Sequence, residues 1–548
     1  MRRRAFLKKI PVAAGAPLVL NGIPIQVLGK GQLQQAVTGS NNDKVIVLIQ
    51  MHGGNDGLNA IIPIDQYAEY YNIRPNIAIP DNGSRGYIPL DSTLDIADQV
   101  GVHPDMVGVK SLYDQGKAAI LQAVSYENHN GSHFRSRDIM FMGGGFEDYY
   151  NSGWAGRYLE HCFPGYPDTH PNTEMPDPLA LEIGTTVSLA FHRANGLPAA
   201  LAVNSPDQFY ELINSVGGLP PDSVANTHYG KELQWIMDVE ESGNQYADRL
   251  LEVFEAGSNS VGVTYPETYP LNAPTNSLNN PLSGQLKLIA RMLSGGSKTK
   301  IFLARIGGFD THADQVESYD PTMGKHAALM YHISSAVEAF QKDLKALGLE
   351  DRVVTTTFSE FGRRAASNGS YGTDHGNAQP MMVFGKAVKP GIIGTNPDLL
   401  NLERNNIPMQ IDYRQVYTTI LKDWMEASDE AINYTLFGEF LNQRLDLFSD
   451  LVTGIDDSFF EDRFKLHSVY PNPVSDSATF SYYINTSVDV QLQLLDIDGK
   501  LVRTLVNEKQ AIGEHHFTED LSDLRPGTYI YKMKAGPLDT AKKLILTR

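Results

Sequence analysis

The sequence contains a single cysteine, Cys162, among 548 residues. One cysteine cannot form a disulfide within the chain or build a thiolate-rich metal site, so any metal must be held by oxygen and nitrogen atoms. Uninterrupted apolar runs of about 18 residues are also missing, and we expect no membrane-spanning helix. Basic residues are outnumbered by acidic ones, and the formal net charge of −19 argues against nucleic acid or an anionic membrane as the main partner.

What is present is typical of a folded protein. Hydrophobic residues make up 42% of the chain and charged residues 20%, as in ordinary globular proteins. The length exceeds that of one compact core, so we expect two or three domains.

The first 38 residues are expected to be an export signal and a short linker. A basic cluster precedes a short apolar segment, and Arg3 to Lys8, RRAFLK, resembles the twin-arginine export motif. The basic region of a general secretory signal is the alternative. The twin-arginine pathway carries proteins that fold before export, often around a metal or cofactor.

The last segment, residues 466–548, is predicted to be a small all-β sandwich, because short alternating strands are separated by turn residues. Its motifs VYPNPVSDSATFSY, LLDIDGKLV and RPGTYIYK resemble the C-terminal sorting domain of the type nine (Por) secretion system. That resemblance implies a Bacteroidetes-type Gram-negative source and the type nine export machinery as a partner. It also implies a product that is secreted or attached to the outer cell surface.

Three central stretches share one design: an apolar run, then glycines or small residues, then acidic residues and histidine. They are Val45–Asn59, Ile301–Gln315 and Val353–Gly376. Open α/β sheets bind ligands at the carboxyl ends of their strands. We therefore predict a doubly wound, mostly parallel α/β sheet over residues 44–448, with one composite site at its edge.

Other segments are assigned from their periodicity. Ala118–Ser125 and the run NAQPMMVFG are predicted to be buried strands, and Pro178–Phe191 a pair of strands. Apolar residues at spacings of three and four predict helices over Tyr229–Glu255 and from Leu329 to Leu347.

Several side chains in these stretches have two interpretations. Asp56 is either a metal ligand at a strand exit or a cap of the following helix. Ser132 is either an ordinary N-cap or a nucleophile at a helix end that favours bound anions. Asp310 and His312 are two residues apart, so on an extended chain both side chains point to one face and can share a metal.

Together the motifs HGGNDGLNAIIP, SHF, GGFDTHADQ, SEFGRR and GTDHG resemble the bacterial family called domain of unknown function 1501, over roughly Lys44 to Phe448. More distantly, their layout is similar to the alkaline phosphatase and sulfatase superfamily. The resemblance implies a divalent metal, with zinc favoured and manganese, magnesium or calcium as alternatives. It assigns metal ligation to Asp56, Asp310, His312, Glu360, Asp374 and His375, and catalysis to Ser132, Arg363 and Arg364.

The sequence departs from the superfamily pattern at one strand end, where Ser359 and Glu360 replace the usual Asp-His doublet and the doublet follows in the next loop. Two functions are compatible with these features. One is a secreted metal-dependent hydrolase acting on an anionic small-molecule or glycan ester. The other is a non-catalytic surface protein of the same fold that binds glycan or a protein partner.

Overall fold

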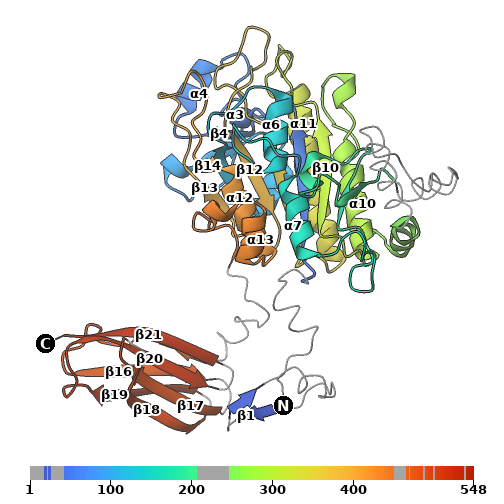
Figure 1. Ribbon diagram of the computed structural model, residues 1–548. Coiled ribbons are helices and arrows are strands. Elements are labelled where there is room, and N and C mark those ends of the chain that lie inside the picture. The colour runs from blue at the N-terminus through green and yellow to red at the C-terminus, as the bar shows by residue number, and fades with distance from the viewer. Residues whose placement is uncertain are drawn as a thin grey trace. The chain divides into compact units, whose positions relative to one another are not determined.

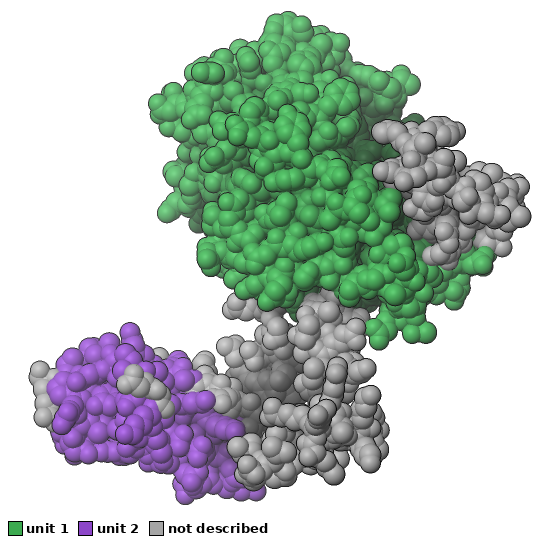
Figure 2. Space-filling view, in the orientation of Figure 1, with its two compact units in different colours: residues 1–449 green, residues 450–548 purple. Residues whose placement is uncertain are grey.

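A computed structural model divides the chain into two compact units, residues 1–449 and residues 450–548 (Figure 2). The residues described are 18–20, 23–25, 42–205, 246–449, 464–467, 469–484, 488–497, 500–511, 513–535 and 538–547. Most of the expected export signal and the start of the helix expected from Tyr229 lie outside these ranges. Among the described residues, no helix is long and apolar enough to cross a bilayer.

The larger unit is built on a nine-stranded sheet with the main order β13-β7-β12-β11-β3-β10-β8-β9, and β14 also pairs with β7 (Figure 1). The strands are β3 (Val45–His52), β7 (Ala118–Ser125), β8 (Ala180–Glu182), β9 (Ala200–Ala202), β10 (Ile301–Gly307), β11 (Val353–Phe358), β12 (Gln379–Phe384), β13 (Gly391–Ile393) and β14 (Ile411–Asp412). Only β12 runs antiparallel to its neighbours, β11 and β7. The predicted α/β class with a mostly parallel sheet is confirmed.

Helices cover both faces of this sheet. They are α3 (Gly57–Ala60), α4 (Tyr67–Ile73), α5 (Val107–Asp114), α6 (His133–Met142), α7 (Trp154–Cys162), α10 (Pro281–Ser294), α11 (Lys325–Ala346), α12 (Tyr413–Thr419) and α13 (Asp429–Tyr434). Helices α5, α10 and α11 share one buried apolar core with alternate residues of β3. On the other face, Phe358 of β11 packs against Phe141 of α6 and Tyr417 of α12, and Figure 1 shows α6, α7, α12 and α13 on the viewer's side of the sheet. Burial on both faces explains why β3 is an almost uninterrupted apolar run and why β11, VVTTTF, is built almost entirely of buried β-branched residues.

Most of the predicted elements are present, and one is wrong. Segment 178–191 forms β8 and a 3-10 helix (Leu189–Phe191) where we expected two strands. The backbone N–H of Ser188 donates to the Glu182 carboxylate at 2.7 Å, which folds the chain back directly after β8. The strand beside β8 is β9, which pairs with it in parallel.

A three-stranded sheet of β4 (Ile61–Pro63), β6 (Val100–Val102) and β5 (Ile88–Pro89) also belongs to the larger unit. Near the amino terminus, β1 (Leu18–Leu20) and β2 (Ile23–Ile25) pair antiparallel.

The smaller unit is a sandwich of two antiparallel sheets, as predicted, with orders β15-β16-β19 and β18-β17-β20-β21. Its strands are β15 (Phe464–Leu466), β16 (Ser477–Ile484), β17 (Val488–Leu495), β18 (Leu501–Gln510), β19 (Gly513–Asp520), β20 (Gly527–Ala535) and β21 (Leu538–Leu546). Alternate side chains of β16 and β17 are buried in one core between the sheets.

The antiparallel direction of β12 matters for the site. Parallel strands β11, β3 and β10 end at one edge of the sheet. Because β12 starts where β11 ends, the connecting loop 359–378 stays at that edge. The sheet topology therefore gathers the loops after β3, β10 and β11 in one place.

Candidate metal centre

The centre is built around the carboxylate of Asp310, in the loop after β10. Three histidine Nε2 atoms approach its Oδ1 atom: His312 at 3.3 Å, His375 at 3.5 Å and His133 at 3.6 Å. The Nε2 atoms of His312 and His375 are themselves 2.8 Å apart. Residues from the α6 start and from the loops after β10 and β11 thus meet at one point.

The opposite nitrogen of each ring faces a hydrogen-bond acceptor. Nδ1 of His133 lies 2.8 Å from Glu360 Oε1, and Nδ1 of His375 lies 2.7 Å from the backbone oxygen of Gly131. Nδ1 of His312 lies 3.3 Å from Asp374 Oδ1. These acceptors favour the tautomer with its proton on Nδ1, which leaves the Nε2 lone pairs directed at the common point.

This arrangement fits a bound cation. Metal-binding histidines characteristically donate their other N–H to a carboxylate or a backbone carbonyl. Around a tetrahedral ion with bonds of about 2.0–2.1 Å, ligand atoms lie about 3.4 Å apart, close to the observed Nε2–Oδ1 distances. Moreover, Nε2 of His133 is buried and has no hydrogen-bond partner among the described residues. One ligand atom each of His133, Asp310 and His375 lies within 4.8 Å of the other two, and His312 falls outside this group of three although its Nε2 atom is near Asp310 and His375.

Asp310 is ionised and held in place. Burial opposes its ionisation, but the hydrogen bond and charge of Arg363 outweigh this and lower the pKa of Asp310 to about 2. Nη2 of Arg363 donates to Oδ1 of Asp310 at 2.6 Å. The same guanidinium donates to the backbone oxygens of Gly54, Thr373, Phe309 and Gly53. Arg363, to which the resemblance assigns a part in catalysis, is buried and positions Asp310.

Glu360 and Asp374, both expected as ligands, lie on the outer side of the histidine rings. Glu360 is buried and also accepts a hydrogen bond from the backbone N–H of Gly53 at 2.9 Å. Burial raises the pKa of Glu360, but hydrogen bonds from His133 and the backbone prevail and lower it. The structure places both carboxylates where they orient His133 and His312.

Asp56 lies apart from the cluster. Both of its carboxylate oxygens accept hydrogen bonds from Nη1 of Arg74 at 2.8 Å, and Gln315 donates to Oδ2 at 2.6 Å. Burial opposes ionisation of Asp56, but Arg74 and His326 outweigh it, so its pKa lies below the usual value. Asp56 is the N-cap residue of α3 yet makes no capping bond with its side chain. The structure therefore gives it neither of the two expected roles.

Ser132 lies between two residues of the cluster. It follows Gly131, whose backbone oxygen contacts His375, and precedes His133. As predicted, it is the N-cap of α6, but its hydroxyl makes no capping bond and is exposed. Arg364 is exposed as well. Ser132 is thus placed beside the cluster with a free hydroxyl.

Sequence reasoning missed two histidines as members of the site, His133 and His52. His133 follows Ser132 directly, and of these two residues only the serine was predicted to belong to the site. His52 is the last residue of β3, and its Nδ1 lies 3.5 Å from Glu360 Oε1. That Nδ1 atom is buried and has no hydrogen-bond partner among the described residues. A histidine ending a buried strand just before two glycines was the available signal.

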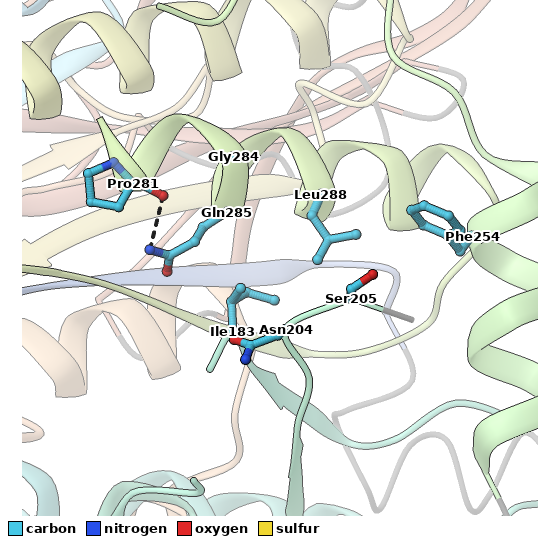
Figure 3. Close-up of a pocket in the computed structure, with 8 residues that line it drawn as sticks. All are labelled: Ile183, Asn204, Ser205, Phe254, Pro281, Gly284, Gln285 and Leu288. Carbon is cyan, nitrogen blue, oxygen red and sulfur yellow. Dashed lines mark hydrogen bonds between the residues drawn. The ribbon is translucent and has the colours of Figure 1, made fainter. Parts of the chain in front are cut away.

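A pocket lies farther along the same edge, at the carboxyl ends of β8 and β9 (Figure 3). Ile183, Phe254 and Leu288 give it apolar walls, and Asn204 and Gln285 add amide groups. None of the lining residues belongs to the histidine cluster, so the pocket is a separate feature.

Two family models match parts of the chain. Residues 253–439 match the family described as protein of unknown function (DUF1501), and residues 468–547 match the secretion system C-terminal sorting domain. Both expected resemblances are confirmed, although the first match covers a shorter range than its motifs. The sorting domain means that the protein is exported by the type nine machinery and is secreted or attached to the outer cell surface.

Solved structures resemble the chain only loosely, and no curated protein matches it. The sulfatase PsFucS1 from Pseudoalteromonas sp. is 11% identical, with 89% of this chain and 86% of that chain covered and a TM-score of 0.30. A protein in the alkaline phosphatase superfamily from Vibrio parahaemolyticus is 10% identical, with 82% of this chain and 78% of that chain covered and a TM-score of 0.31. We draw no conclusion about activity from either.

Proposed function

We propose that this exported protein is a metal-dependent hydrolase of the phosphatase or sulfatase type that acts on an anionic ester outside the cell. The observation that carries the proposal is the convergence of three histidine Nε2 atoms on Asp310 Oδ1, with each Nδ1 facing an acceptor. The layout of the sequence motifs, which is distantly similar to that of the alkaline phosphatase and sulfatase superfamily, supports the choice of reaction.

In this proposal His133, His312, His375 and Asp310 hold one divalent cation. Their nitrogen and oxygen donors suit zinc, with manganese as the main competitor; magnesium and calcium prefer oxygen ligands. When bound, such an ion stabilises negative charge on the ester oxygens.

The chain itself supplies the rest of the site. Ser132 presents an exposed hydroxyl beside the cluster and is the proposed nucleophile. Ser132 is the N-cap residue of α6, and the backbone N–H groups at a helix N-terminus favour negative charge. Arg363 holds Asp310, and the exposed Arg364 is available to an anionic group.

The test is an assay of the purified full chain with p-nitrophenyl phosphate and p-nitrophenyl sulfate, after loading with zinc or manganese and again after chelation. We expect metal-dependent turnover that falls by at least about 100-fold in Ser132→Ala, since loss of a nucleophile removes its whole pathway. Arg291→Gln, which changes a guanidinium on α10 outside the cluster, is the matched control.

The burial of Arg363, which is bonded to Asp310 and so is not open to an ester, favours a second function, a non-catalytic surface protein with a structural metal that binds glycan or a protein partner. Stoichiometric metal together with no turnover of either ester, by wild type or by any loaded form, would decide for this second function.

A further inference from the structure

Two exposed aromatic rings lie in α6, the helix that supplies His133, and in the loop after it. Each ring is in contact with the guanidinium group of an arginine. Phe134 is 73% exposed and Tyr149 is 80% exposed. The guanidinium carbon of Arg137 lies 5.6 Å from the Phe134 ring centre, and that of Arg135 lies 3.7 Å from the Tyr149 ring centre. Large aromatic side chains left in solvent at a candidate site commonly mark a binding surface.

The first of these pairs adjoins the metal centre. Phe134 follows His133 in the first turn of α6. Arg137 is four residues after His133, so the two side chains share one face of the helix. Arg137 is also near His52: burial lowers the pKa of that histidine, Glu360 opposes this, and the charge of Arg137 lowers it further. Arg137 therefore lies on the same face of α6 as His133, which belongs to the centre.

The second pair joins the first turn of α6 to the loop after this helix. Arg135 donates to the backbone oxygens of Phe146 and Asp148, which fixes the loop that carries Tyr149. The Tyr149 ring is therefore held against Arg135 and stays open to solvent on its other side. The repetition of an aromatic ring with a guanidinium suggests a ligand with a repeating structure.

We infer that Phe134, Arg137 and Tyr149 form a binding surface for the sugar chain of an anionic glycan, whose ester group reaches the metal centre. The inference rests on the proposed function and names its substrate class. Aromatic faces pack against the apolar faces of sugar rings, and guanidinium groups bind sulfate, phosphate or carboxylate through paired hydrogen bonds. The chain as a whole carries a net charge of −19, and Arg137 lies 3.6 Å from Asp138, so a bound polyanion has to compete with this carboxylate for the guanidinium.

The test is affinity electrophoresis of the full chain through gels that contain dextran sulfate, chondroitin sulfate or neutral dextran, with and without chelator. We expect retardation by at least one sulfated polymer and none by neutral dextran. Phe134→Ala, Arg137→Gln and Tyr149→Ala should each weaken that affinity about fivefold to tenfold. The controls are Tyr71→Ala on α4 and Lys342→Gln on α11, both exposed, and each should stay within about twofold of wild type.

The outcomes separate this inference from the proposed function, because retardation needs neither turnover nor metal. Retardation lost in the three variants but kept after chelation supports the glycan surface even if no ester is hydrolysed. No retardation by either sulfated polymer, or equal losses in the two controls, overturns it. A change in sedimentation of Phe134→Ala from dimer to monomer also overturns it, since the surface would then be an interface between copies.

Discussion

The Nδ1 atom of His133 lies 2.8 Å from the Oε1 atom of Glu360, a carboxylate that the fold buries behind the ring. This contact fixes the tautomer and the orientation of His133 and leaves its Nε2 lone pair for a cation. Glu360 is therefore a positioning residue of the metal centre.

Glu360→Gln should weaken zinc binding by about 10- to 100-fold, the usual effect of removing a carboxylate behind a metal-binding histidine. Competition with a fluorescent chelator measures it. Glu182→Gln, which changes a buried glutamate at the end of β8, is the control and should leave zinc affinity unchanged. Equal losses in both variants would mean that only general stability had been disturbed.

Gly53→Ala should displace the loop that carries Asp310. A Cβ atom at position 53 would lie 2.3 Å from the backbone nitrogen of Asp310, and the φ of Gly53 is +126°. We expect zinc affinity to fall about as far as in Glu360→Gln, by 10- to roughly 100-fold. Gly83→Ala is the control, because Gly83 also has a positive φ but no atom within 4 Å of the added Cβ. Unchanged affinity in Gly53→Ala would contradict the geometry of this loop.

Asp56→Ala should reduce stability and leave metal content intact. The substitution strands the Arg74 guanidinium in a fully buried position, and breaking a buried ion pair typically costs about 3–5 kcal/mol. Urea unfolding measures the loss, and elemental analysis of the folded fraction measures the metal. His375→Ala should show the reverse pattern, losing metal with little change in the stability of the chelated protein, because the side chain of the half-buried His375 pairs with no buried arginine among the described residues. Loss of metal from folded Asp56→Ala would restore Asp56 as a ligand.

Asp56 also shows which features of the site could be predicted from the sequence and which could not. The strand ends of β3, β10 and β11 were predictable, because apolar runs give way to glycine, acidic residues and histidine. The partner of Asp56 was not, since Arg74 lies in a segment without a regular pattern and only the tertiary fold brings them together. His133 and His52 were missed for a related reason: no local spacing links them to Asp310 or Glu360.

The strand directions of the sheet were likewise predictable only in part. The mostly parallel order followed from buried apolar strands separated by helices. The antiparallel direction of β12 did not, because a fully buried strand has the same apolar composition in either direction. That direction keeps His375 at the edge of the sheet.

His326 should make stability depend on pH. Burial lowers the pKa of this fully buried residue to about 4, with Asp56 opposing the shift. The unfolded chain takes up the proton near pH 6.5, so the stabilisation is complete above that pH and is lost as pH falls toward 4. The free energy of unfolding should fall by about 3 kcal/mol in total, because each unit of difference between the folded and unfolded pKa is worth about 1.4 kcal/mol. Urea unfolding of chelated protein between pH 7.5 and about 4.5 measures it. His326→Gln should flatten the profile, and parallel profiles for the two proteins would contradict the assignment.

The central claim is the metal centre, and elemental analysis of the purified full chain by inductively coupled plasma mass spectrometry tests it most directly. Wild type and the single variants His133→Ala, His375→Ala and Asp56→Ala are loaded with zinc or manganese, desalted and measured. The account predicts about one ion per chain in wild type and Asp56→Ala, as one set of four ligands requires, and a near-complete loss in both histidine variants. No bound metal in wild type, or full metal content in His133→Ala and His375→Ala, would contradict it.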